Sequence, residues 1–511
     1  MTLKDTTDRL LAQAPSRGGL HPVIAPFTGD IAFELPLSSV SDVDDAYAAA
    51  RAAQPSWSAL SVRERSRIFL RFHDLVIEHR DEALDILQCE NGKARRDALE
   101  EVIDVAITSR HYGRNSAALL RPKHRRGAVP GAVGVVELRH PKGVVGVIAP
   151  WNYPLTLAVS DAIPALIAGN TVVLKPDWQT SLIALWAVEL LRRAGLPTDV
   201  MQIVTGDGPI VGPLVVDRSD FVMFTGSTRV GREVAERCGQ RLISCSLELG
   251  GKNAMVVRAD ANVAKAAEIA TRACFANSGQ LCVSMERAFI HRDVYDAFVT
   301  AFVARTKAMV LKNGIGWGAD MGSLTSERQK ERVLGYVSDA VDRGARVLAG
   351  GRARPDIGPY FVEPTILEGV IPGMTMCAEE TFGPVVALQP VDSDDEAVSR
   401  ANDTTYGLHA VVLTRDAKAG RRLASRLRVG TVSVNEAHGA AWGSTRAPMG
   451  GVGDSGLGRR HGDEGLLKYT EVQAIATQRI LGFSAPAGMS DERWGTFLVR
   501  AMGLLTKLGL K

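Results

Sequence analysis

The sequence has few cysteines, no long apolar run and almost no excess of charge of either sign. Its 511 residues include six cysteines, at positions 89, 238, 245, 274, 282 and 377, and no two of them form a CxxC pair. This pattern favours neither a disulfide framework nor a zinc site of the usual ligand spacing. The formal net charge is +3, from 60 basic and 57 acidic residues, so nucleic acid is not expected as a partner.

Membrane and export signals are also lacking. The most apolar segment, 153–176, is interrupted by Asp161, Pro164 and Gly169, which makes it a poor membrane span. The opening residues, MTLKDTTDRLLAQAPSRGG, have no basic start followed by an apolar stretch. We therefore expect a cytoplasmic protein with no membrane partner.

The chain is organised as an alternation of helical patterns and short apolar runs. From about residue 40 to 120, apolar residues recur every three or four positions, which predicts helices. Apolar runs stopped by Gly or Pro then follow, at 143–150, 170–176, 201–206, 221–227 and 253–257. Helical patterns lie between them, at 155–168, 180–194, 209–216 and 229–238. This alternation predicts an α/β fold with a doubly wound parallel sheet, and a second alternating region from about 262 to 430 predicts another.

The last residues predict an amphipathic helix within 486–511. Apolar side chains recur near helical spacing at Trp494, Phe497, Leu498, Ala501, Leu504, Leu505 and Leu508. Such a stripe packs on the protein's own fold, on a second subunit or on a membrane surface, and packing within or between subunits is the favoured interpretation.

Three polar side chains stand in unusual surroundings. Cys282 lies in the run FANSGQLCVS, after a series of small and polar residues. Four interpretations are open for it: a buried apolar residue, half of a disulfide, a metal ligand or a nucleophile. Asn152 lies between bulky rings in APWNYPL, as a turn residue or as a donor to a developing oxyanion. Glu248 ends an apolar run in SLELGGKNA, as a solvated cap or as a base. Taken alone, each of the three has a structural alternative.

A glycine-containing turn, FTGSTRVGRE at 224–233, follows a predicted strand and opens a helix. Free amide groups at a helix start suit a phosphate group. The turn differs from a P-loop because Arg232 and Glu233 replace the usual Lys and Ser or Thr, so hydrolysis of nucleoside triphosphates is not expected. The chain also contains no GxSxG elbow, which argues against a serine hydrolase of the α/β type.

Taken together, these motifs resemble the aldehyde dehydrogenase superfamily from about residue 20 to 480. The matching motifs, in chain order, are PWNYP, VVLKP, FTGSTRVG, LELGGKNA, GQLC, EETFGPVV and PMGGVGDSGLGRRHG. Within the superfamily, the chain is similar to bacterial NADP-dependent succinate-semialdehyde dehydrogenases of the second type. The resemblance implies two doubly wound parallel-sheet domains and an oligomerisation arm, assembled as a homodimer or homotetramer.

The resemblance also implies a division of the chain into parts. The dinucleotide-binding domain would comprise 1–122 and 142–250, and the catalytic domain 251–430. The bridging and oligomerisation region would comprise 123–141 and 431–485.

The same resemblance implies a role for each of the three polar residues. Cys282 would be the nucleophile, Asn152 would hold the oxyanion, and Glu248 would activate water. The reaction would oxidise an aldehyde to a carboxylic acid through a thiohemiacetal and a thioester. A non-catalytic structural homologue is the alternative of another class.

The cofactor expected from the resemblance is NADP, with NAD as the alternative, and no metal is expected. The residues implied in cofactor binding are Trp151, Lys175, Trp178, Gly226, Ser227, Leu249, Glu380 and Phe382. NAD-preferring members carry a glutamate three residues after the lysine. Trp178 occupies that position here, so no carboxylate there repels a 2′-phosphate.

Succinate semialdehyde is the expected substrate, and the resemblance is weakest at this point. Characterised enzymes bind the distal carboxylate with two arginines, where this chain has Ser160 and Ala276. Arg110, Arg272 and Arg446 are candidate replacements, because a buried carboxylate without a cation is costly. A broad-specificity aliphatic or aromatic aldehyde dehydrogenase is the alternative.

Overall fold

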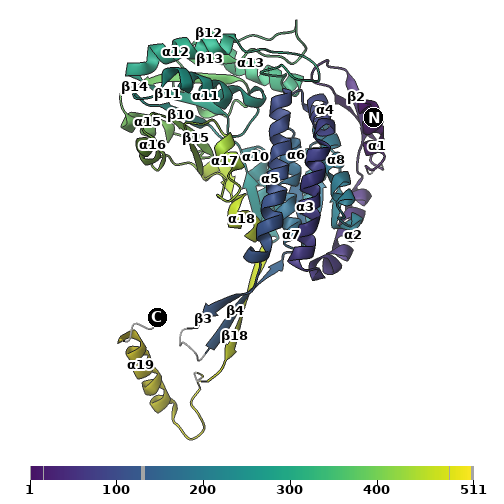
Figure 1. The fold of residues 1–511 in the computed structure, drawn as a ribbon, viewed down its shortest axis with the longest axis vertical. Helices are drawn as coiled ribbons and strands as arrows, with labels where there is room; N and C mark the ends of the chain where they lie inside the picture. Colours follow the sequence, from purple (N-terminus) through teal and green to yellow (C-terminus); the bar gives the residue numbers. More distant parts are fainter. Residues whose placement is uncertain (1, 15–16, 128–132, 481, 483, 508–511) are drawn as a thin grey trace.

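The computed structural model describes residues 2–14, 17–127, 133–480, 482 and 484–507, and shows two α/β units from which a thin arm projects (Figure 1). Each unit contains one mainly parallel sheet, with six strands in the first and seven in the second. The predicted α/β class with two doubly wound sheets is therefore confirmed.

The first sheet has the strand order β17-β9-β8-β5-β6-β7, in which only β17 is antiparallel to its neighbour. Its strands are β5 (Val144–Ile148), β6 (Thr171–Lys175), β7 (Met201–Ile203), β8 (Phe221–Thr225), β9 (Cys245–Glu248) and β17 (Gly456–Leu457). Alternate residues face opposite sides. Val172 and Leu174 join one apolar cluster, and Val173 joins another. Both faces are thus covered by helices, which explains why the strands read as continuous apolar runs.

The helices around this sheet come from two parts of the chain. Those before it are α1 (Leu3–Leu11), α2 (Val40–Ala59), α3 (Val62–Glu78), α4 (Arg80–Asn91) and α5 (Arg95–Leu119), with a hairpin of β1 (Leu20–Ile24) and β2 (Ile31–Pro36). Those between its strands are α6 (Pro154–Val159), α7 (Ala162–Ile167), η1 (Trp178–Thr180), α8 (Ser181–Arg193), η2 (Thr198–Val200), α9 (Gly208–Arg218) and α10 (Thr228–Gln240). The predicted helix 155–168 is therefore two helices, α6 and α7, which meet at Ser160 and Asp161.

The second sheet has the order β12-β13-β14-β11-β10-β15-β16, and only β12 is antiparallel. Its strands are β10 (Asn253–Val257), β11 (Met285–His291), β12 (Arg346–Ala349), β13 (Thr365–Glu368), β14 (Val385–Val391), β15 (His409–Leu413) and β16 (Thr431–Val434). Its helices are α11 (Val263–Phe275), η3 (Ala276–Gly279), α12 (Arg292–Lys307), α13 (Glu327–Asp342), α14 (Thr375–Ala378), α15 (Asp394–Ala401) and α16 (Ala417–Ala424). The sheet extends beyond residue 430, where the sequence-based boundary falls, because β16 pairs with β15.

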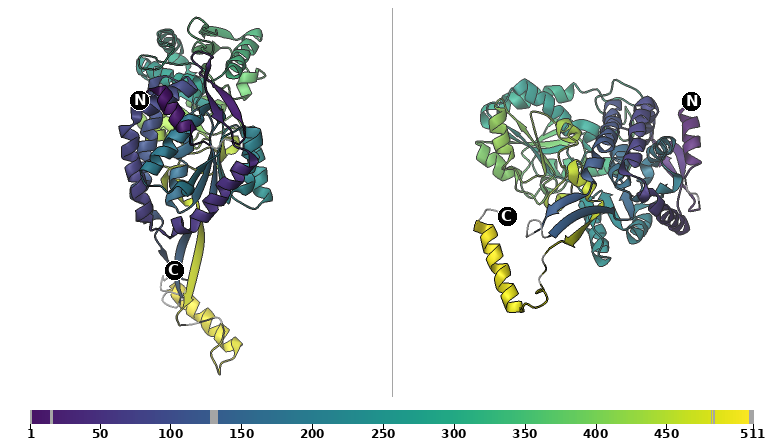
Figure 2. Two further views of the ribbon diagram at one scale, coloured as in Figure 1. Left: turned by 90° about the vertical axis from the view of Figure 1, so that its right-hand side faces the viewer. Right: turned by 60° about the horizontal axis from the view of Figure 1, so that its bottom comes forward.

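The arm is a three-stranded antiparallel sheet of segments far apart in the sequence (Figures 1 and 2). Its strands are β3 (Lys123–Arg126), β4 (Val133–Pro141) and β18 (Thr470–Gln478), in the order β18-β4-β3. Residues 128–132 of the predicted arm lie outside the described residues. Before β18 the chain forms α17 (Gly439–Gly443), η4 (Gly453–Ser455) and α18 (Gly462–Leu467).

The C-terminal helix α19 (Asp491–Lys507) lies beside the arm, away from both sheets (Figure 1). The indole of Trp494 donates a hydrogen bond of 3.0 Å to the carbonyl of Gly482, while Phe497, Met502 and Leu504 are exposed. The helix matches the predicted amphipathic segment, although Leu508 of the predicted stripe lies outside the described residues. Over the described ranges, no helix has the length and apolarity needed to cross a membrane.

Candidate active site

Cys282 follows a turn that only particular residues tolerate. Asn277, Ser278 and Gly279 have positive φ angles of 49°, 56° and 69° in succession. A Cβ atom on Gly279 would lie 2.0 Å from the carbonyl oxygen of Gly383, so this position requires glycine. The turn brings Cys282 from the end of α11 to the start of β11.

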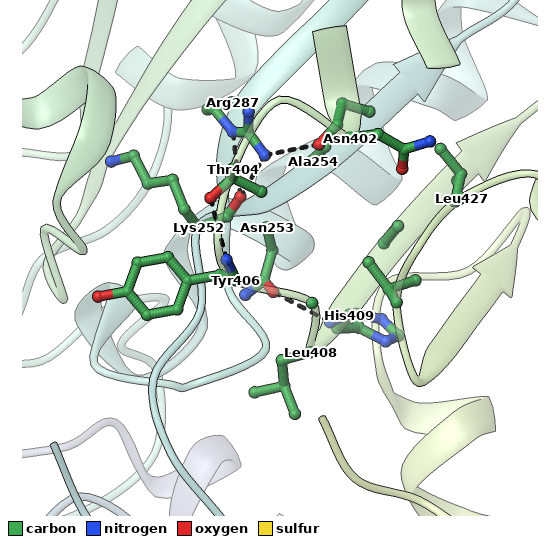
Figure 3. Close-up of a pocket in the computed structure, with 14 residues that line it drawn as sticks. Lys252, Asn253, Ala254, Arg287, Asn402, Thr404, Tyr406, Leu408, His409 and Leu427 are labelled. Atoms are coloured by element: carbon green, nitrogen blue, oxygen red, sulfur yellow. Dashed lines mark hydrogen bonds between the residues drawn. The ribbon is translucent and has the colours of Figure 1, made fainter. Parts of the chain in front are cut away.

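Asn253, the first residue of β10, fixes the backbone on both sides of the cysteine. Its side-chain amide donates hydrogen bonds to the carbonyls of Cys282, at 2.7 Å, and Ser284, at 2.8 Å. Its oxygen accepts a hydrogen bond of 3.1 Å from the backbone N–H of His409 (Figure 3). Sequence reasoning gave Asn253 no role, although it stands in the motif LELGGKNA, because its hydrogen-bond partners are distant in the chain.

Asn152, which follows β5, lies against the cysteine turn. Its side-chain amide donates a hydrogen bond of 3.0 Å to the carbonyl of Gln280. Its backbone carbonyl accepts hydrogen bonds from Lys93 Nζ at 2.7 Å and from Asn277 Nδ2 at 3.0 Å. Lys93 is fully buried and forms an ion pair with Glu101. Asn152 is thus held rigidly, with one amide N–H left for another acceptor.

The Cys282 sulfur lies in apolar surroundings. The cluster that it joins consists of Tyr153, Leu157, Leu281, Val283, Leu408, Met449 and Trp442. Removal of water raises the pKa of the thiol to about 12, while the guanidinium of Arg460 acts in the opposite direction. The thiol is therefore protonated at neutral pH.

Glu248 ends β9 with a buried side chain that lacks an ordinary partner. Among the described residues, its Oε1 atom has no hydrogen-bond partner. A Cβ atom on Gly450 would lie 3.1 Å from Oε1, and the adjacent Met449 belongs to the cluster around Cys282. Burial raises the pKa of Glu248 to about 7, and the charge of Glu248 in turn affects the pKa of Cys282. The structure thus brings Cys282, Asn152 and Glu248 into one region.

A cavity of about 930 Å³ lies at the carboxyl edge of the first sheet, lined by the ends of β5, β6 and β8 at Ile148, Lys175 and Phe224. Two of the predicted cofactor residues, Trp151 and Trp178, also line it. The Trp178 ring stacks on His21 with a centroid distance of 3.9 Å, so it is fixed against the wall. The size and position of the cavity suit a dinucleotide.

Gly226, Ser227 and Leu249 lie where β8, β9 and α10 meet. Ser227 is the N-cap of α10, and its hydroxyl accepts a hydrogen bond from the Val230 N–H at 3.4 Å. Gly226 donates its N–H to the carbonyl of Glu248 at 3.1 Å. The helix start suited to a phosphate is therefore bonded directly to the strand that carries Glu248.

Glu380 and Phe382 approach the same region from the second sheet. Glu380 accepts a hydrogen bond of 2.8 Å from the Gly251 N–H, and the Phe382 ring contacts Trp151 edge-on with a centroid distance of 5.5 Å. The backbone N–H groups of Thr381 and Phe382 donate to Glu286. Burial, followed by the charge of Glu286, raises the pKa of Glu380 to about 8.

The three proposed replacement arginines are either paired with carboxylates or exposed. Arg272 is bonded to Asp97 at 2.5 Å and also to Glu100. Arg110 and Arg446 are exposed. In the described part of the chain, no group of three or more His, Cys, Asp or Glu residues forms a candidate metal site.

At the two positions where characterised enzymes have arginines, the structure shows no cation. The Ser160 hydroxyl donates to Asp104 at 2.6 Å, and Ala276 is buried.

The two sheets and the large cavity at a carboxyl edge are the architecture of a dinucleotide-binding α/β enzyme. The sequence model of the aldehyde dehydrogenase family matches residues 14–475, and the chain belongs to this family. The predicted family membership is thereby confirmed.

Relatives of known name support the same family. A Mycobacterium tuberculosis protein named a putative succinate-semialdehyde dehydrogenase (NADP+) 2 is 50% identical over 94% of this chain and 93% of its own length. A Mycolicibacterium smegmatis protein with a similar name is 49% identical over 96% and 94%.

Solved structures agree with the fold. A Burkholderia cenocepacia protein, described as a putative aldehyde dehydrogenase, superposes with a TM-score of 0.88 at 34% identity, covering 93% of this chain and 98% of that one. A Bacillus cereus aldehyde dehydrogenase in complex with NAD+ gives a TM-score of 0.86 at 33% identity, covering 94% and 99%.

Proposed function

We propose that this chain oxidises succinate semialdehyde to succinate with NADP+, using Cys282, Asn152 and Glu248. The observation that carries the proposal is the buried Glu248 carboxylate, without a hydrogen-bond partner at Oε1, in the region of the Cys282 thiol. A base is needed there, because water must lose a proton as it attacks the thioester that forms on Cys282.

The first step forms a bond between Cys282 Sγ and the aldehyde carbon, and the thiol proton is released to water. The carbonyl oxygen becomes an oxyanion, which accepts a hydrogen bond from the free N–H of Asn152 and another from the Cys282 backbone. Donors fixed in advance stabilise such charge more than mobile ones do. The hydrogen bond from Asn152 to Gln280 keeps the amide at the turn that carries the nucleophile.

When bound, the nicotinamide would accept the hydride that leaves the thiohemiacetal carbon. The thioester left on Cys282 is then hydrolysed. Glu248 takes a proton from water, the hydroxide attacks the thioester carbon, and the carboxylic acid leaves as the Cys282 sulfur is released. A pKa near 7 allows Glu248 to accept this proton at neutral pH.

The choice of NADP+ follows from the cavity and the relatives. Lys175 lines the cavity and donates only to the carbonyl of Pro176, at 3.1 Å, among the contacts of the described residues. An ammonium group has three donors, so two remain for phosphate oxygens. Arg229 and Arg237 also line the cavity, where they pair with Glu233 and Asp217, and the carboxylates of Asp177, Asp207 and Glu233 belong to the same lining. The neutral Trp178 ring adds no repulsion. The mycobacterial relatives are named for NADP+.

Uncharged aliphatic or aromatic aldehydes are the second candidate substrates. The surroundings of Cys282 are apolar, and the nearby Tyr153 hydroxyl contacts Glu100, the carboxylate that also binds Arg272. A distal carboxylate would have to compete with Glu100 and Asp97 for that arginine.

A substrate panel separates the candidates. Reduction of NADP+ is followed at about 340 nm with succinate semialdehyde, hexanal and benzaldehyde. A higher kcat/KM for succinate semialdehyde supports the first candidate, and a preference for the uncharged pair contradicts it. Repeating the panel with NAD+ tests the cofactor, since a preference for NAD+ above about tenfold overturns the NADP+ assignment.

We further propose a homodimer or homotetramer in the cytoplasm, joined through 123–141 and 431–485. Dinucleotide binding is assigned to 1–122 and 142–250, and catalysis to 251–430 together with β16, which pairs with β15 in the same sheet. The exposed Val472 and Ile475 on β18 support a role of the arm in assembly. All six cysteines are free thiols, as is typical of a reducing compartment. Light scattering coupled to size exclusion tests the assembly, and a monomer would contradict it.

A further inference from the structure

A buried ion pair with no role in the proposed reaction lies beside Glu248. Arg460 Nη2 donates a hydrogen bond of 2.7 Å to Asp161 Oδ2, and the two side chains are only 7% and 5% exposed. Burying two charges costs free energy that their mutual attraction often fails to repay. A pair kept at this position therefore calls for a functional explanation.

The backbone places Arg460 next to the base. Arg460 and Met449 exchange both backbone hydrogen bonds, at 2.7 and 2.8 Å. The residue after Met449 is Gly450, the glycine whose Cβ would approach Glu248 Oε1. Arg460 thus belongs to the strand-like segment that covers the carboxylate.

The side chain of Arg460 reaches the same face of the sheet as Glu248. Its Nη2 also donates to Thr225 Oγ1 at 3.2 Å, and Thr225 is paired with Glu248 across β8 and β9. The ammonium of Lys468 donates to Ser246 Oγ at 3.2 Å, two residues before Glu248 and therefore on the same face of β9. Two cations thus flank the carboxylate.

The charged and titratable groups that face Glu248 have opposing effects. Arg460, Lys468 and Arg459 favour its ionised form, whereas burial and the charge of Asp161 disfavour it. Other titratable groups near Arg460 are Cys282, Asp104, Tyr112, His461 and Tyr469. Burial lowers the pKa of Lys468 to about 8, so this cation loses its charge as the pH rises, whereas the guanidinium keeps its charge.

We propose that Arg460 is a positioning residue that keeps Glu248 ionised for hydrolysis of the thioester, and that Asp161 holds its guanidinium in place. The inference rests on the proposed role of Glu248. The Nε atom of Arg460 and the Oε1 atom of Glu248 are both buried, and neither has a hydrogen-bond partner among the described residues. Each of the two side chains therefore retains one unused hydrogen-bonding site in the same region.

The test compares Arg460→Met with Arg460→Lys by the pH dependence of kcat and of thioester hydrolysis after a single turnover. Loss of the positive charge raises the pH of half-maximal hydrolysis by about one unit, because an opposite charge at this range shifts a carboxyl pKa by about 1–3 units. The Met variant therefore hydrolyses about tenfold more slowly below pH 7 and recovers at about pH 9. The Lys variant stays within about half a unit of the parent protein.

Two further variants keep the result interpretable. Arg460→Met combined with Asp161→Asn removes both buried charges, so it folds even if the single Met variant does not. Arg258→Met removes an arginine paired with Asp394 at 2.9 Å in the second α/β unit, and its pH profile should match that of the parent protein.

An equal loss of rate at every pH in the Arg460 variants, or a Lys variant that behaves like Met, would overturn the inference. Glu248→Gln separates this outcome from failure of the proposed function. If the limb near pH 7 survives in Glu248→Gln, Glu248 is not the base. If the rise in rate near pH 7 disappears in Glu248→Gln but keeps its midpoint in the Arg460 variants, only the positioning role fails.

Discussion

The side-chain amide of Asn152 and the carbonyl of Gln280 are joined by a hydrogen bond of 3.0 Å, two residues before Cys282. This bond connects the end of a strand in the first sheet with the turn that leads into the second. The buried Lys93 ammonium holds the Asn152 backbone from behind at 2.7 Å. The relative position of the amide and the sulfur is therefore set by packing that exists before substrate binds.

Replacing Asn152 by Ala should lower kcat/KM by about 10²–10³-fold, because one donor to the oxyanion is lost. Binding of NADP+ should be nearly unchanged, as measured by quenching of tryptophan fluorescence. Asn152→Asp should be no better than Ala, since a carboxylate offers no donor. An Asp variant with near-normal activity would contradict the donor role.

Alkylation of Cys282 by iodoacetamide should accelerate about tenfold for each unit of pH between about 7 and 9, in the absence of cofactor. The physical reason is that burial raises the pKa of the thiol to about 12, so the thiolate fraction rises throughout this range. Peptide mass spectrometry gives the rate at this residue, and a small-molecule thiol serves as control. A plateau below pH 9 would show that the resting enzyme already stabilises the thiolate.

Glu248→Gln should leave a rapid burst of reduced cofactor followed by slow turnover, because acylation of Cys282 outpaces hydrolysis of the thioester. In the parent protein, kcat should rise with pH through a midpoint near 7, since burial raises the pKa of Glu248 to about 7 and only the ionised form accepts a proton. Stopped-flow absorbance measures both effects. Absence of the burst would argue against Glu248 as the base.

Gly279→Ala should abolish activity and lower the melting temperature. The new Cβ would lie 2.0 Å from the Gly383 carbonyl, at a residue with φ of 69°. Strain in this backbone region costs about 1–3 kcal/mol even without a clash. Gly335→Ala is the matched control, because its Cβ meets nothing within 4 Å in α13. That variant should be slightly more stable, and equal behaviour of the two would refute the steric argument.

The sequence predicts four of the six strands of the first sheet, β5, β6, β7 and β8, because buried parallel strands are continuous apolar runs with sharp ends. The predicted runs do not include β9 or β17. The prediction failed at Ser160 and Asp161, where a helical pattern continues across a break. Asp161 is bonded there to Arg460, a contact across 299 positions that no local pattern reveals. It also ended the second unit before β16, since the four residues TVSV are too short and polar to read as a strand.

The candidate site was predictable only in part. Cys282, Glu248 and Asn152 stand in motifs whose order resembles a known family. Asn253 and Arg460 act through hydrogen-bond partners that are distant in the sequence and come close only in the folded chain. Their roles could therefore be inferred only from the structure. The tie between Arg272 and Asp97 likewise became visible only in three dimensions.

The hydrogen bond from the Gly226 amide to the Glu248 carbonyl has a mechanical consequence. Gly226, just before α10, and Glu248, the proposed base, are joined by one backbone hydrogen bond of 3.1 Å, with no side chain between them. A shift at the start of α10 would be transmitted to the β9 backbone through this hydrogen bond. The backbone position of Glu248 therefore depends directly on the position of the α10 start.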